Sequence, residues 1–129
     1  MGACPAQPTR MTHRLEVTPE GILEVEYFGA TTFADRASAL DALSVDMGPG
    51  TRRILVNFLG AQIVAGDDGS RLDFIAKAIT HPLLDNCRVA MLGIPAADAH
   101  ASQTAGLIRQ IKVRTFDDRA EAVAWLLAG

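Results

Sequence analysis

The sequence has little of what marks a disulfide-rich or an aromatic-rich protein. Its 129 residues include two cysteines, Cys4 and Cys87, and aromatic residues make up 5% of the chain. So few cysteines imply no disulfide framework, and we expect free thiols in a reducing compartment, the cytoplasm. With so few aromatic rings, the core must be built from small and aliphatic side chains, which favours close packing of helices on a sheet.

Long apolar runs and clusters of basic residues are also missing. Apolar runs such as residues 122–128 are far shorter than the roughly 20 residues of a membrane-spanning helix, and no secretory segment follows the N-terminus. The formal net charge is −3, and the basic residues form no run of the kind that marks nucleic-acid binding. We therefore expect one globular domain with no membrane span and no nucleic-acid partner.

No pattern typical of a metal centre or a catalytic nucleophile is present. His13, His81 and His100 lie on different expected elements, without the local pair of His or Cys that zinc sites use. No serine has the sequence neighbours of an activated nucleophile, and Cys87 is interpreted as a small apolar core residue. We therefore predict no metal, no cofactor and no catalytic residue, in a protein that is not an enzyme.

The first third of the chain predicts a hairpin followed by a helix. Apolar and polar residues alternate over 13–17 and 23–27, with a proline- and glycine-containing turn at 18–21 between them. This pattern is typical of two antiparallel, half-buried strands. Thr32 and Asp35 then have the spacing of a helix N-cap and its first turn.

The rest of the chain alternates buried runs with helical stripes. The first helix is expected to end at 48–50, and a loop is expected from Gly60. The pattern predicts strands at 53–59, 89–92 and 113–116, and helices at 69–81, 98–111 and 117–127, the last capped by Asp117. The residues expected to face the sheet are Leu72, Ile75, Ala76 and Ile79, then Leu107, Ile108 and Ile111, then Ala120, Val123, Ala124 and Leu127.

The resulting element order is ββαβαβαβα. Strands that alternate with helices are typically parallel neighbours, while the hairpin contributes an antiparallel strand. We therefore predict an α/β fold, a single domain over 13–129 with a mixed, mostly parallel five-stranded sheet and four helices, after a flexible leader at 1–12.

Several segments resemble the STAS domain, and within it the SpoIIAA-like, anti-sigma-factor antagonist-like branch. They are the buried strand ending at 56–60, the apolar pair Ile63-Val64, the glycine-containing turn before Leu72, and the closing segment at 115–126. The resemblance covers about residues 13 to 129. It implies a SpoIIAA-like fold and a regulatory, protein-binding role.

The resemblance also implies a phosphorylation site that this sequence lacks in its usual form. Regulatory members of the family carry an Asp-Ser-Ser/Thr-Gly motif at the start of the helix, and a partner kinase phosphorylates its hydroxyl. Here the aligned residues are Gly66-Asp67-Asp68-Gly69, so acidic residues replace both hydroxyl residues. Each carboxylate carries about half the charge of a phosphoserine. Ser70, one position later, is a displaced candidate phosphoacceptor.

The leading prediction is therefore a non-enzymatic regulatory or protein-binding module. Phe74 and Ala78 lie off the main apolar stripe of their helix, so this helix has a second apolar face. Its occupant is a partner protein, a second copy of the chain in a homo-oligomer, or the neighbouring first helix. The candidate partner-binding residues are Ile63, Val64, Asp67, Asp68, Ser70 and Phe74.

An alternative function is binding of a small apolar ligand or lipid. The SpoIIAA-like branch is similar to lipid-carrier domains in its arrangement of helices over a sheet. Such binding needs a void beneath the helices, whereas the small-residue composition favours tight packing.

Overall fold

The computed structural model describes residues 13–42, 53–64, 68–81, 84 and 87–128. The predicted leader at 1–12, the predicted helix end at 48–50 and Asp67 lie outside the described residues. The described elements are β1 (His13–Val17), β2 (Leu23–Thr31), α1 (Phe33–Ala42), β3 (Arg53–Ile63), α2 (Asp68–Thr80), β4 (Arg88–Leu92), α3 (Ala96–Arg109), β5 (Lys112–Phe116) and α4 (Arg119–Ala128).

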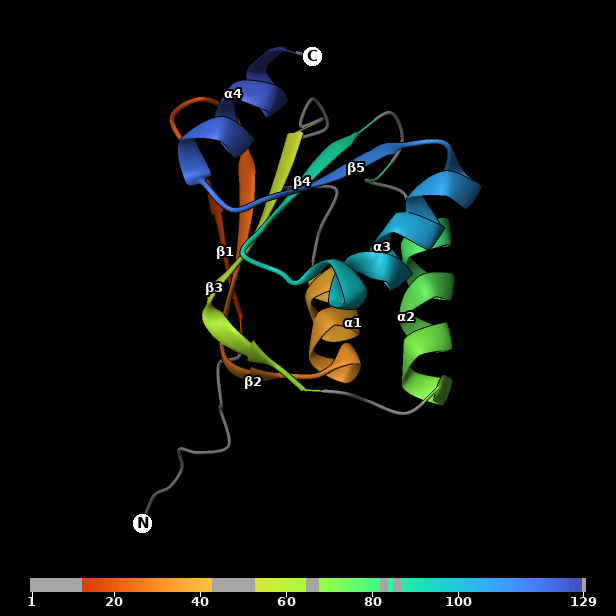
Figure 1. Ribbon diagram of the computed structural model, residues 1–129. Helices are drawn as coiled ribbons and strands as arrows, with labels where there is room; N and C mark the ends of the chain where they lie inside the picture. The colour runs from red at the N-terminus through yellow and green to blue at the C-terminus, as the bar shows by residue number, and fades with distance from the viewer. Residues whose placement is uncertain (1–12, 43–52, 65–67, 82–83, 85–86, 129) are drawn as a thin grey trace.

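Over these residues the strands form one five-stranded sheet whose order follows the chain, β1-β2-β3-β4-β5. β1 is antiparallel to β2, and every other neighbouring pair is parallel. Helices α1, α2 and α3 cover one face of the sheet, while α4 covers the other (Figure 1). The predicted α/β class, element order and mixed sheet are confirmed.

Local hydrogen bonds explain where the first elements begin and end. The amide of Gly21 donates to the carbonyl of Thr18 at 2.9 Å, which closes the predicted turn between β1 and β2. At the start of α1, the Asp35 amide donates to Thr32 Oγ1 and the Thr32 amide donates to Asp35 Oδ2, at 3.1 and 2.9 Å. This reciprocal capping confirms the predicted helix start.

The strand predicted at 53–59 is longer than its apolar run. β3 continues to Ile63, where a loop was predicted from Gly60, because β2 also continues and supplies pairing partners. Phe28 pairs with Gly60 and Thr31 with Ile63, after a shift of register between Glu26 and Phe28. The extension is exposed and polar in places, so its periodicity does not mark it as a strand.

Two separate cores lie on the two faces of the sheet. Beneath α1–α3, the core includes Tyr27, Phe58 and Met91, each at most 4% exposed. Beneath α4, a smaller core includes Leu55, Leu92 and Leu126, each fully buried. Burial of β3 on both faces confirms the interpretation of its continuous apolar run.

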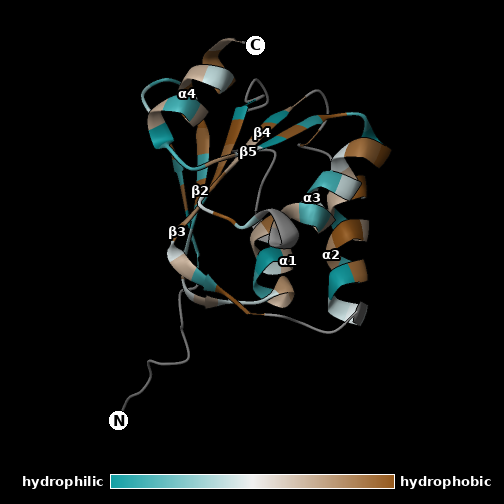
Figure 2. Cartoon of the chain, in the orientation of Figure 1, coloured by the Kyte–Doolittle hydropathy of each residue, from teal (hydrophilic) through white to brown (hydrophobic). Residues whose placement is uncertain are grey.

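The inward faces predicted for α2 and α3 are correct only in part. Ile75, Ile79 and Ile111 are half-buried and pack against the core, as predicted, but the other residues of the two predicted faces do not. Phe74 and Ala78 of α2 are buried, whereas Leu72 is 59% exposed and Ala76 is also exposed; hydrophobic and hydrophilic bands alternate along this helix (Figure 2). In α3, Leu107 and Ile108 are 81% and 58% exposed, and small residues are buried instead, namely Ala99, Ala101, Ala105 and Gly106.

The close approach of α3 to β5 is the physical reason for its small inward residues. A Cβ atom added at Gly106 would lie 2.6 Å from Cγ2 of Val113. No larger side chain fits there without moving the helix away from the strand. A prediction that places the largest apolar residues inward therefore selects the wrong face of α3.

The predicted cap and inward face of α4 are also corrected. The Glu121 amide donates to Asp118 Oδ2 at 3.1 Å, so Asp118 rather than Asp117 caps this helix. Ala122 and Leu126 are fully buried, while Leu127 is 42% exposed. Of the other residues predicted to face inward, Val123 is half-buried, and Ala120 and Ala124 are exposed.

Candidate functional site

The end of β3 and the start of α2 lie at the end of the fold where β2 and β3 finish and α1 and α2 begin (Figure 1). Ile63 is half-buried and paired with Thr31. Val64 is 39% exposed, and its amide donates to the Thr31 carbonyl at 2.9 Å. The predicted residues Ile63 and Val64 are thus positioned by the end of a strand rather than by a loop.

Among the remaining predicted site residues, Ser70 and Phe74 differ in burial. Asp68 is the first residue of α2, and Ser70 is half-buried in its first turn. Phe74, by contrast, is 6% exposed, and its ring centroid lies 5.9 Å from that of Phe33 in α1. Of the occupants left open by the sequence, the neighbouring helix is the one that Phe74 contacts.

A buried arginine lies among the aromatic rings between α1 and α2. Arg36 is 2% exposed, and its guanidinium carbon lies 4.6 Å from the centre of the Phe74 ring and 4.8 Å from that of Phe33. Its Nη2 donates to Ser102 Oγ of α3 at 2.7 Å. The cation–π contacts and this hydrogen bond tie the three helices together.

An apolar cavity of about 80 Å³ lies between the sheet and helices α1–α3. This corrects the expectation of tight packing throughout the core. The volume holds several water-sized groups, and its lining is almost wholly apolar, with Arg36 and Ser102 as polar side chains at its wall. Among the other lining residues are Tyr27, Ala78, Met91 and Ala105.

Tyr27 forms part of the cavity wall and is held neutral there. Its ring stacks on Phe58 with centroids 4.9 Å apart and planes 12° apart. Burial raises the pKa of the Tyr27 phenol well above its usual range, because the charged form is poorly solvated in this core. The phenol therefore stays uncharged at neutral pH as part of the cavity wall.

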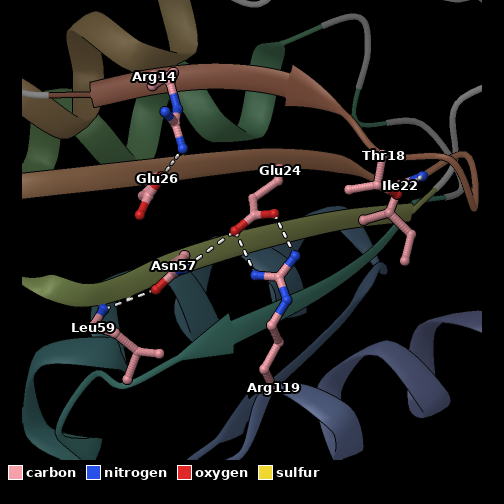
Figure 3. A network of polar contacts seen from close by, with 8 residues as sticks. All are labelled: Arg14, Thr18, Ile22, Glu24, Glu26, Asn57, Leu59 and Arg119. Atoms are coloured by element: carbon pink, nitrogen blue, oxygen red, sulfur yellow. Dashed lines mark hydrogen bonds and ion pairs between the residues drawn. The ribbon is translucent and has the colours of Figure 1, made fainter.

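On the opposite face of the sheet, a buried carboxylate fixes α4 to β2. Glu24 is 9% exposed, and its two carboxylate oxygens accept hydrogen bonds from Nη1 and Nη2 of Arg119 at 2.7 and 2.6 Å (Figure 3). Asn57 Nδ2 also donates to Glu24 Oε2 at 3.1 Å. This geometry is a two-pronged ion pair supported by a third hydrogen bond.

The ion pair shifts both ionisation equilibria. The Arg119 guanidinium holds the pKa of Glu24 below its usual value, with the Asn57 hydrogen bond acting in the same direction against the effect of burial. The Glu24 carboxylate in turn raises the pKa of Arg119. Both groups are charged at neutral pH, which gives them a structural role and not the split protonation of an acid–base pair.

Sequence reasoning missed the cavity and the residues Arg36, Glu24 and Arg119. Arg36 follows Phe33 at the i, i+3 spacing of one helix face, and this spacing is a local signal for its contact with that ring. Glu24 and Arg119 are 95 residues apart, so their pairing follows only from the sheet order and the position of α4. In the part of the chain that the structure describes, no three His, Cys, Asp or Glu residues gather as metal ligands would.

Comparison with solved structures identifies the fold. The structure matches an uncharacterised protein from Shewanella loihica with a SpoIIAA-like fold, with a TM-score of 0.57, 16% identity, and coverage of 88% of this chain and 91% of the other. The anti-sigma factor antagonist SpoIIAA in its unphosphorylated form matches with a TM-score of 0.56 at 12% identity, covering 91% and 98%. This chain therefore has the SpoIIAA-like fold, as the resemblance implied.

A further match is to the Bacillus cell fate determinant SpoIIAA in its phosphorylated form. Its TM-score is 0.51 at 16% identity, with coverage of 88% of this chain and 97% of the other. No family model matches the sequence. No curated protein matches it either. Over the described residues, no helix has the length and apolar character needed to cross a membrane.

Proposed function

We propose that this protein is a non-enzymatic regulatory module of the cytoplasm that binds a partner protein. The binding surface, called here the β3–α2 surface, consists of Ile63, Val64, Asp67, Asp68, Ser70 and Leu72. The observation that supports it most directly is exposure: Val64 and Leu72 are 39% and 59% exposed at the end of β3 and the start of α2. Exposed apolar side chains of this kind are available for contact with a partner protein.

The fold supports a regulatory role for this surface. Two of the matched structures are of an anti-sigma factor antagonist, in unphosphorylated and phosphorylated forms. In this chain, Asp67 and Asp68 supply fixed negative charge where the family implies a phosphorylated hydroxyl. Ser70 lies in the first turn of α2, where the helix dipole favours a phosphate group, so it remains our candidate phosphoacceptor.

Replacing Val64 and Leu72 by serine is expected to reduce partner capture at least tenfold, because two exposed apolar contacts are lost. The full chain carrying a tag is crosslinked in its native cells, and the crosslinked proteins are identified and quantified by mass spectrometry. Leu127→Ser is the control, since Leu127 is also 42% exposed but lies on α4. A crosslinked second copy of the chain would identify self-association at the same surface. Equal recovery of every partner by V64S/L72S, wild type and L127S would exclude the β3–α2 surface.

The cavity beneath α1–α3 supports a second candidate function, the binding of a small apolar ligand. Its lining combines apolar side chains with the hydroxyl of Ser102 and the guanidinium of Arg36 at one wall. Pockets of this kind hold the apolar part of a ligand and orient it through a few polar groups. The cavity is small, so this candidate applies to compact ligands of a few apolar groups.

Filling the cavity is expected to abolish binding of a small apolar probe. Toluene is titrated into the full chain, and methyl NMR signals of Met91 and Val113, both cavity-lining residues, are followed. In Ala105→Leu the added side chain occupies the void, so these shifts are lost. Ala124→Leu is the control, because Ala124 is exposed on α4. Absence of any saturable shift in the wild type would exclude the ligand-binding candidate without affecting the β3–α2 proposal.

A further inference from the structure

Basic residues occupy neighbouring positions on the α4 face of β3, β4 and β5. In the sheet register Arg53 pairs with Arg88, and Arg88 pairs with Lys112. Arg114 lies two residues after Lys112 on β5 and therefore on the same face. The inward side chains that continue these strands on this face, Leu55, Leu92 and Phe116, pack in the core beneath α4.

This arrangement brings like charges into close proximity. Paired residues on neighbouring strands lie roughly 4.8 Å apart, and residues two apart along a strand lie roughly 6.6 Å apart. Arg88, Lys112 and Arg114 thus share an area about 8 Å across. Like charges on directly paired positions destabilise a sheet, so a triad of this kind favours a bound counter-ion.

The described residues supply no carboxylate to this triad. None of the ion pairs in the described part of the chain involves Arg88, Lys112 or Arg114. The Nε atom of Arg88 is buried and has no hydrogen-bond partner. On β1 and β2 of the same sheet, by contrast, Glu24 and Glu26 are paired with Arg119 and Arg14.

Two aromatic rings hold the arginines of the triad in place. The guanidinium carbon of Arg88 lies 4.2 Å from the centre of the Trp125 ring, and that of Arg114 lies 5.1 Å from the centre of the Phe116 ring. Contact with an aromatic face leaves the N–H groups in the plane of a guanidinium available to an anion. Arg53 adds positive charge beside the triad, while its Nε donates to the Leu126 carbonyl at 2.8 Å.

We propose that Arg88, Lys112 and Arg114 form a binding site for a compact phosphate-bearing anion with two or more negative charges. Guanidinium groups match phosphate oxygens in pairs, and the ammonium of Lys112 adds a point charge. The short span of the triad suits adjacent phosphoryl groups better than the spaced carboxylates of an acidic peptide. This site is on the opposite face of the sheet from the cavity and is independent of the function proposed above.

Pyrophosphate is the probe for this site. The full chain is titrated with pyrophosphate at constant ionic strength, and the indole N–H signal of Trp125 and the melting temperature are followed. Saturable movement of the indole signal and a rise in melting temperature are expected for the wild type. In K112Q/R114Q the affinity for pyrophosphate, measured by either readout, is expected to fall at least tenfold. The two substituted residues are exposed, so the variant is expected to keep its fold.

R14Q/K77Q is the matched control, because it loses the same formal charge from two cations elsewhere on the molecule. Its response to pyrophosphate is expected to equal that of the wild type. Equal weakening in both double variants, or an effect of pyrophosphate no larger than that of sodium chloride or succinate at the same ionic strength, would overturn the site.

Vesicles of phosphatidylglycerol distinguish the source of the phosphate. Sedimentation with these vesicles that pyrophosphate displaces and K112Q/R114Q lacks would assign the site to a lipid headgroup. Pyrophosphate binding without such sedimentation would assign it to a free phosphate compound. Binding of vesicles that persists in K112Q/R114Q and resists pyrophosphate would place membrane contact elsewhere and count against the triad as its cause.

Discussion

Replacing Leu126 by alanine is expected to lower the free energy of unfolding by about 3 kcal/mol. Leu126 is fully buried beneath α4, where it packs with Leu55, Leu92 and Ala122. Truncation removes apolar surface from this small core and leaves a void that the surrounding strands cannot fill, because they are fixed by the sheet. Urea denaturation of both proteins, followed by circular dichroism, gives the difference.

Leu127→Ala is the control for this substitution, since it removes the same atoms from the next residue. Leu127 is 42% exposed, so its truncation is expected to change the free energy of unfolding by less than about 1 kcal/mol. Equal destabilisation by the two substitutions, or a larger effect at Leu127, would contradict the orientation of α4, in which Leu126 is buried and Leu127 is exposed. It would favour the inward face that the sequence alone predicted.

Replacing Arg119 by alanine is expected to lower the free energy of unfolding by about 2 kcal/mol at pH 7. It leaves the Glu24 carboxylate buried, with Asn57 as its remaining side-chain partner. Because the Arg119 side chain is 46% exposed, the effect is smaller than for a fully buried pair. Arg14→Ala, which breaks the exposed pair with Glu26, is the control and is expected to have an effect below about 1 kcal/mol.

The same ion pair predicts a pH dependence of stability. The pKa of Glu24 is lower in the folded protein than the usual value of about 4.3 for a glutamate, so the folded state favours the carboxylate. This contribution is fully present above the unfolded pKa and is lost as the pH falls through the folded pKa. Thermal unfolding between pH 7 and pH 3 should show a smaller loss of stability in R119A than in the wild type. Parallel profiles for the two proteins would contradict this role of Glu24.

Much of the fold could be predicted because its signals are local. Alternation over 13–17 and 23–27, the capping pair of Thr32 and Asp35, and the apolar run of β3 each depend on neighbouring residues. The packed faces of α3 and α4, and the burial of Phe74 and Ala78 in α2, could not be predicted in this way. The orientation of a helix depends on contacts with residues far away in the sequence, such as the contact of Gly106 with Val113 and the ion pair of Arg119 with Glu24. Large apolar residues were assigned inward, whereas close contact with the sheet requires small ones in α3.

Among the candidate sites, too, those with a local sequence signal could be predicted and those formed by distant residues could not. Ile63, Val64 and Ser70 could be proposed from their place between a strand and a helix. The basic triad could not, because Arg88, Lys112 and Arg114 are separated along the chain and meet only through the register of β4 and β5. The cavity depends on how three helices pack over one sheet, which composition does not determine.

The sheet order also bears on how the chain folds during synthesis. Because each strand pairs with the next one made, the sheet grows at a single edge from β1 to β5. Helices α1, α2 and α3 can cover one face as they emerge, whereas α4 follows the last strand. The apolar residues of the opposite face, Leu55 and Leu92 among them, therefore remain exposed to water until that helix is made. Formation of the Glu24–Arg119 ion pair, which joins α4 to β2, accompanies the burial of this apolar surface.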